Sequence, residues 1–112
     1  MNKEQLRKTL YELKESLAIS DNIKIELTSM KTKAASISLK RNTIRLNKNI
    51  VYTLDQDCIE HLIVHELTHY KLGNTYHNRE FHEQINKCIE NAKSKETERK
   101  ILQSLLKSNN VL

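Results

Sequence analysis

The first part of the chain repeats leucine at helical spacing. Four leucines recur at steps of three and four residues, which places them on one stripe of a helix expected over residues 3–18. They are Leu6, Leu10, Leu13 and Leu17. Lys, Arg and Glu occupy the opposite face, so this helix is expected to pack its leucine stripe against the rest of the protein.

The hydrophobic period then shortens to two. Apolar and polar residues alternate from Ile23 to Leu27, around Ile37 in residues 35–39, and again over Thr43–Asn47. This alternation predicts three short strands. Because no helical pattern separates them, we expect the strands to form an antiparallel meander.

A helical period returns at Thr53. The segment from Thr53 to Gln56 has the form of a capping box, and apolar residues then recur at helical spacing as far as Leu72. Gly73 is a typical stop signal. This helix is apolar on more than one side, so we expect it to lie centrally beneath the sheet.

Two amphipathic helices are expected beyond this stop. One covers about residues 78–93, with Phe81 and Ile85 facing inward, and the other runs from Thr97 to about Lys107. The prediction is therefore an α+β fold. A small three-stranded, mostly antiparallel sheet packs on a central helix, flanked by an N-terminal helix, a helix that follows the central one, and a C-terminal helix.

Composition limits the class of protein. The chain has 112 residues, of which 38% are hydrophobic and 29% charged, with no Pro and one Gly. These values fit one small globular domain over residues 1–112 and exclude collagen-like and Pro/Gly-rich disordered chains. No apolar run reaches the roughly 18 residues of a membrane span, and the N-terminus lacks a signal-peptide core. We expect a cytoplasmic protein without membrane insertion.

Charge and cysteine content add little chemistry. The net charge of +5 permits contact with nucleic acid, but acidic residues interleave with the basic ones. An ordinary solvated surface is favoured, and no nucleic-acid partner is expected. Cys58 and Cys88 form no C-x-x-C pair, and we expect both to be small buried side chains in a reducing compartment.

The central helix carries an H-E-x-x-H motif, residues 65–69. At 100° per residue, His65 and His69 lie about 40° apart and one turn along the helix, so both rings can reach one metal ion. Neutral imidazole is a good zinc ligand. Glu66 lies beside them, where its carboxylate can take a proton from water.

A catalytic zinc ion usually has a third protein ligand. His77 follows just past Gly73, so the chain can fold back and bring it to the metal. Glu80 or Glu83 on the next helix is the alternative, giving two histidines and a carboxylate.

Two further histidines are not expected to hold the metal. His61 lies one turn before His65. Three ligands at His61, His65 and His69 would span about 12 Å along one straight helix, which is too long a span for one metal ion. We interpret His61, and also His82, as a solvated or core histidine.

The stretch from His65 to Phe81, HELTHYKLGNTYHNREF, resembles the zinc helix and the following His-x-x-x-Phe element of compact zincin metallopeptidases. With its length and short sheet, the chain resembles the minigluzincins, soluble minimal metallopeptidases similar to the catalytic domains of membrane-embedded peptidases. In that family a histidine replaces the glutamate usual in gluzincins as third ligand, which matches His77. The resemblance covers roughly Leu39 to Ile89 and implies a zincin-like scaffold.

The resemblance implies a zinc metalloendopeptidase with one Zn²⁺ per chain. Its metal ligands would be His65, His69 and His77, and Glu66 would be the general base for hydrolysis of a peptide or protein substrate. An extended substrate would pair with an exposed sheet edge, for which Thr43–Asn47 is the expected strand.

A side chain near the zinc would stabilise the oxyanion that forms during hydrolysis. Tyr70, Tyr76 and His82 are candidates, because each offers a phenol or an imidazole. The sequence does not choose among them, and simple packing or exposure is the favoured interpretation of all three.

The C-terminal segment, about residues 94–112, is short and amphipathic and must bury its apolar stripe somewhere. It can dock on its own body, cover the cleft, or exchange with a second copy to form a homodimer. Minigluzincins are held as zymogens by their C-terminal segments, so the resemblance implies a latency role.

Two other functions remain open. A metal-dependent endoribonuclease also uses three histidines, but its motif lacks a glutamate directly after the first, so Glu66 argues against it. A non-catalytic zinc-stabilised binding or scaffold module would make Glu66 dispensable.

Overall fold

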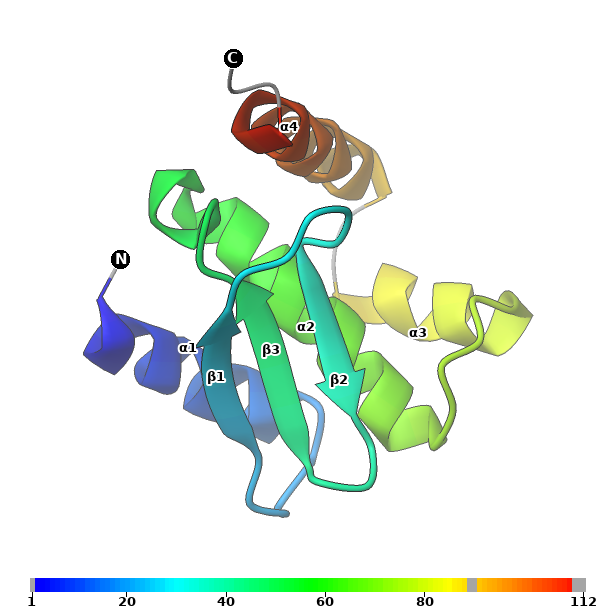
Figure 1. Cartoon of the computed structure of the whole chain (residues 1–112). Coiled ribbons are helices and arrows are strands. Elements are labelled where there is room, and N and C mark those ends of the chain that lie inside the picture. Colours follow the sequence, from blue (N-terminus) through cyan, green and yellow to red (C-terminus); the bar gives the residue numbers. More distant parts are fainter. Residues whose placement is uncertain (1, 89–90, 110–112) are drawn as a thin grey trace.

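The computed structural model describes residues 2–88 and 91–109 of the chain. In chain order the elements are α1 (Lys3–Ser16), β1 (Lys24–Thr28), β2 (Ala35–Ser38), β3 (Thr43–Asn47), the 3₁₀ turn η1 (Val51–Thr53), α2 (Gln56–Leu72), α3 (Arg79–Cys88) and α4 (Asn91–Asn109). The sheet lies in front of α2, with α1 beside β1 and α4 at the N-terminal end of α2 (Figure 1). The predicted α+β fold is confirmed.

The order of the strands differs from the predicted meander. The sheet has the order β1-β3-β2, in which β3 pairs parallel with β1 and antiparallel with β2. Thr43–Asn47 is therefore the central strand, and its prediction as the exposed substrate-binding edge is wrong. The reason lies in the connection after β1, which carries the chain past the position of β3 before β2 begins.

Asn47 holds this connection in place. Its side-chain amide donates hydrogen bonds to the backbone carbonyls of Met30 and Lys33, both at 2.9 Å. Asn47 itself is buried at the end of β3. This long-range anchor fixes the start of β2, which forms one wall of the site described below.

The two ends of α2 are defined by local capping. Asp55, rather than Thr53, is the N-cap, because its carboxylate accepts a hydrogen bond from the Cys58 backbone at 2.9 Å. Thr53 lies in η1, and its hydroxyl donates to the Ile50 carbonyl at 2.7 Å. At the other end Gly73 adopts a left-handed conformation with φ of 74°, as the stop signal predicts.

The core lies between the sheet and α2. Ile44 of β3 and Ile59, Ile63 and Leu67 of α2 are fully buried, and the leucine stripe of α1 packs against them. Ile101 joins this core from α4. A second, smaller cluster holds α3 in place through Val64, Phe81 and Ile85. These contacts make α2 a rigid, buried support for the side chains on its open face.

The predicted C-terminal boundaries shift slightly. α3 ends at Cys88 rather than at about residue 93, and α4 begins at Asn91 rather than Thr97, so the helix is longer than its apolar stripe suggests. Cys58 is buried and free, as expected, whereas the Cys88 side chain lies outside the described part. None of the helices in the described residues combines the length and apolarity that a membrane crossing requires.

Candidate metal centre

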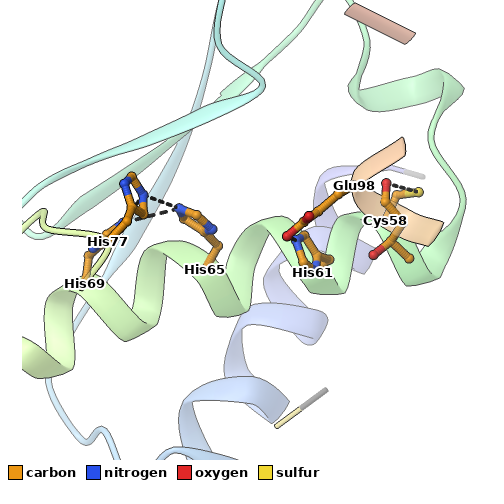
Figure 2. A network of polar contacts seen from close by, with 7 residues as sticks. Cys58, His61, His65, His69, His77 and Glu98 are labelled. Carbon is orange, nitrogen blue, oxygen red and sulfur yellow. Dashed lines mark hydrogen bonds and ion pairs between the residues drawn. The ribbon is translucent and has the colours of Figure 1, made fainter. Parts of the chain in front are cut away.

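Three histidine rings meet at one point on the open face of α2. His65 and His69 come from α2, and His77 comes from the loop between α2 and α3. Their three Nε2 atoms form a triangle in which each pair is 3.2 Å apart (Figure 2). The structure thus brings together the three histidines predicted from the motif and its downstream neighbour.

The segment after α2 explains how His77 reaches this point. Gly73 ends the helix, and the Nδ1 atom of His69 lies 3.2 Å from the carbonyl oxygen of the next residue, Asn74. An N–H at His69 Nδ1 can donate to that carbonyl, which leaves the lone pair of Nε2 facing the triangle. The turn at Gly73 and Asn74 therefore has two effects. It brings His77 back to α2, and it orients the ring of His69.

Phe81 supports all three rings from below. Its ring is stacked on His69 with centroids 4.5 Å apart, and it meets His65 and His77 edge-on at 4.7 and 5.0 Å. Phe81 is buried, and its backbone N–H donates to the Asn78 side chain that begins α3. The His-x-x-x-Phe spacing thus has a physical role, because the phenylalanine packs under the histidine triangle.

The triangle has the dimensions of a zinc site. Ligand nitrogens at about 2.0 to 2.1 Å from a tetrahedral zinc ion stand about 3.3 to 3.4 Å apart, close to the 3.2 Å separations found here. Neutral imidazoles also cannot satisfy one another in this arrangement, because each carries only one N–H. A cation at the centre would satisfy three inward lone pairs at once.

The environment favours the neutral form of His65 and His69, which is the form that binds metal. Burial, with smaller contributions from His69 and His77, lowers the pKa of His65 to about 3. Burial and the neighbouring His77 also lower the pKa of His69, although its contact with Asn74 opposes this. These residues therefore present lone pairs rather than charges at neutral pH.

Glu66 lies beside the triangle and is nearly buried, with 5% of its surface exposed. Its Oε2 atom has no hydrogen-bond partner among the described residues. Burial raises the pKa of Glu66 to about 7, with Lys33 acting in the opposite direction. A carboxylate with this pKa can both accept and release a proton near neutral pH.

A cleft of about 600 Å³ runs along α2 past these residues. His65, Glu66 and His69 contribute to its floor, and the segment from Lys33 to Ile37, which includes most of β2, forms one wall. The end near the N-terminus of α2 is lined by α4, through Glu98, Ile101, Leu102 and Leu105. The histidine triangle and an apolar surface therefore share one cavity.

His61 lies in the same cleft but outside the histidine triangle (Figure 2). Its ring is buried, its Nε2 atom lies 3.6 Å from a carboxylate oxygen of Glu98, and its Nδ1 atom has no partner in the described part of the chain. Burial lowers the pKa of His61, and Glu98 opposes this. His61 is thus a core histidine that contacts α4, a contact that helical spacing cannot reveal.

The remaining sequence candidates are not among the residues that line the cleft. Glu80 and Glu83 are exposed on α3, and Glu83 pairs with Arg79 at 3.0 Å. The three oxyanion candidates, Tyr70, Tyr76 and His82, do not line the cleft either. The hydroxyl of Tyr70 instead donates to Asp21, which ties α2 to the segment before β1.

The fold and this site together define a class of protein. A small sheet packed on a helix with two histidines and a glutamate, and a third histidine folded back onto them, is the arrangement of a compact zincin-type metallopeptidase. The chain belongs to the YgjP-like metallopeptidase domain family, whose model matches residues 2–103.

Individual relatives agree with this assignment. An uncharacterized protein of Methanocaldococcus jannaschii, MJ0123, is 35% identical over 94% of this chain and 96% of the relative. Among solved structures, the metallopeptidase zymogen jannalysin of M. jannaschii is 35% identical, with a TM-score of 0.80 over 89% of this chain and 96% of that chain. The zymogen abylysin of Pyrococcus abyssi is 26% identical, with a TM-score of 0.82 over 89% and 94%. Both zymogens are minigluzincins, so the resemblance found in the sequence is confirmed.

Proposed function

We propose that this chain is a zinc-dependent endopeptidase that holds one zinc ion through His65, His69 and His77 and uses Glu66 as general base. The observation that carries the proposal is the Nε2 triangle, with 3.2 Å sides, beside a buried carboxylate oxygen that has no partner in the described structure. Membership in a metallopeptidase family supports it.

In this proposal a bound zinc ion supplies Lewis-acid chemistry, which polarises the scissile carbonyl and makes a water molecule more acidic. Glu66 accepts a proton from that water as its oxygen attacks the carbonyl carbon. The C–N bond of the peptide then breaks, and Glu66 delivers the proton to the leaving amine. The products are a carboxylic acid and an amine, and Glu66 returns to its ionised form.

The outer edge of β2 offers a place for an extended substrate. The Asn47 backbone N–H donates to the Ala34 carbonyl at 2.8 Å, which sets the alternation of hydrogen bonds along β2 and β3. By this alternation Ala35 and Ile37 turn their N–H and C=O groups away from β3, and both residues line the cleft. A peptide paired with β2 would therefore lie across the histidine triangle.

The C-terminal segment, residues 94–112, is proposed to confer latency. Support comes from Glu98, Ile101, Leu102 and Leu105 of α4, which line one end of the same cavity as the metal centre. The similarity to two metallopeptidase zymogens also favours this role.

Glu66→Gln tests the catalytic part of the proposal. The variant should retain zinc but cleave an unfolded protein substrate at least about a hundredfold more slowly, since general-base catalysis contributes about 10²–10⁴-fold. Glu60→Gln on the same helix is the matched control, because Glu60 does not line the cleft. To allow for latency, both variants are also compared in a chain truncated after Lys93. Equal cleavage by the Glu66 variant and the control would contradict the proposal and favour a scaffold function.

A further inference from the structure

The sheet has a second open edge, on β1, at the opposite side of the sheet from the cleft. The Lys24 N–H donates to the Asn42 carbonyl at 2.9 Å, and the Thr28 carbonyl accepts from the Lys48 N–H at 3.0 Å. These bonds fix the parallel ladder between β1 and β3, in which alternate residues of β1 face β3. Ile25 and Leu27 therefore turn their backbone N–H and C=O groups outward, and within the described chain these groups have no hydrogen-bond partner.

A groove follows this edge between β1 and α1. Two adjoining hollows of about 310 and 540 Å³ share Arg7, Ile25 and Glu26, so together they follow the strand from Lys24 to Thr28. α1 begins beyond the outer edge of β1 and passes behind this strand (Figure 1). The free backbone groups of β1 are thus flanked by a helix that can contact the side chains of anything paired with the strand.

The groove is strongly basic. Four cations line it and none of them forms an ion pair among the described residues: Lys3, Arg7, Lys14 and Lys24. Its one carboxylate, Glu26, lies 3.9 Å from Arg45. Tyr11, which is 63% exposed, also lines the groove. The floor is apolar, with the buried side chains of Leu6 and Leu10 beneath it.

We infer that the β1 edge and α1 form a docking groove for an extended acidic segment of a partner protein. The segment adds a strand beside β1 through main-chain hydrogen bonds to Ile25 and Leu27. Because side chains alternate along a strand, every second residue of the segment faces α1, where an acidic side chain meets Arg7 or Lys14. Electrostatic attraction by the four cations also speeds association with the acidic segment at low salt.

The groove is independent of the metal centre. β3 separates the β1 edge from β2, whose outer edge borders the cleft. A segment bound at β1 therefore leaves the histidine triangle accessible, and the groove can recruit either a substrate or a regulator. The inference does not rest on the proposed peptidase activity, because its test measures binding.

The positive charge of the groove distinguishes among the partners that could bind an open strand edge. A second copy of this chain, paired through β1, would bring two sets of unpaired cations together, which opposes association. A single-stranded nucleic acid would satisfy the cations but offers no regular ladder to the backbone groups of Ile25 and Leu27. An extended acidic peptide satisfies both features.

The test uses the full-length protein, labelled with ¹⁵N, and a capped peptide of alternating Glu and Val. The matched probes are a Lys-Val peptide of equal length and a short oligothymidylate. We expect the acidic peptide to bind in fluorescence anisotropy and the Lys-Val peptide not to bind. The amide signals of Ile25 and Leu27 should shift, and their hydrogen exchange should slow, because these N–H groups enter the new ladder.

Two variants and a control locate the site. Arg7→Glu should weaken binding by about tenfold or more, whereas Lys8→Glu makes the same charge change on an exposed residue outside the groove and should alter it by less than about twofold. Ile25→Pro removes one outward N–H, which an edge strand tolerates, and should weaken binding while circular dichroism stays unchanged.

Several results would overturn the inference. Equal losses in the Arg7 and Lys8 variants would show only diffuse charge attraction. Signal changes at β2 and α2 would place the peptide in the cleft, and tighter binding of oligothymidylate would point to nucleic acid. An absence of binding, or self-association through β1, would also contradict it.

Discussion

Glu66 shows how much of the site is decided by single residues. Its carboxylate is nearly buried and its Oε2 atom lacks a partner among the described residues, which destabilises the ionised form. Such an arrangement is costly to the fold and is typical of a functional carboxylate. The proposed role of Glu66 in proton transfer would account for this cost.

A pH-dependent stability follows for the metal-free protein. The folded-state pKa of Glu66 is raised from 4.5 to about 7, so between these pH values the unfolded chain releases a proton that the folded chain keeps. Folding stability is therefore lost as the pH rises through this window, by up to about 3 kcal/mol. Glu66→Gln lacks this loss, so its stability relative to wild type should increase from pH 4.5 to 7 in chelator-treated protein, measured by urea unfolding. A pH-independent difference would contradict the burial argument.

At the residue scale the sequence predicted the histidine cluster well, because H-E-x-x-H specifies both residue types and helical spacing. It missed the contact between His61 and Glu98, because these residues belong to helices far apart in the chain. It also missed Asn47, whose two hydrogen bonds to the loop before β2 depend on the tertiary structure. A lone buried asparagine carries no local signal that separates it from a turn residue.

At the scale of elements, alternation and helical period gave the positions of strands and helices to within a few residues, except at the end of α3 and the start of α4. They could not give the pairing, since the alternation of side chains fixes which face a strand buries and not which neighbour it pairs with. The parallel pairing of β1 and β3 follows from the connection after β1, which places β2 on the other side of β3. This exchange of central and edge strands moves the expected substrate edge from Thr43–Asn47 to β2.

The end of α2 gives a prediction at this scale. Gly73 has a φ of +74°, and a Cβ atom there would meet no heavy atom within 4 Å. Gly73→Ala should therefore cost about 1 kcal/mol of unfolding free energy through backbone strain alone. Gly73→Asn is the matched variant and should cost less, because Asn tolerates the left-handed region. Thermal unfolding checks both, and equal losses would show that contacts rather than φ decide the effect.

At the scale of the whole molecule, α4 connects the core to the cleft. Lys100 pairs with Asp55 at 3.2 Å, Glu98 approaches His61, and Ile101 enters the main core. The other helices hold the histidine triangle without α4, since the ligands and Phe81 come from α2, α3 and the loop between them. Under the proposed latency role, this division would let the C-terminal segment control access to the cleft without contributing to the histidine triangle.

Truncation after Lys93 tests that division. Because α4 lines one end of the cleft, its removal should raise the rate of peptide hydrolysis, while the loss of its core contacts should lower thermal stability. A chain that ends at Asn109 retains α4 and is the matched control, with a rate equal to that of the full chain. A folded truncated protein with an unchanged or reduced rate would contradict the latency role.

The most direct test of the central claim is the zinc content of the purified protein, measured by elemental analysis on wild type, Glu66→Ala and His77→Ala. The geometry predicts one zinc ion per wild-type chain, full retention in the Glu66 variant, and a clear reduction in the His77 variant, because three histidine nitrogens at 3.2 Å from one another form the site. No zinc in wild-type protein purified with excess metal, or equal zinc in the wild type and the His77 variant, would contradict the account.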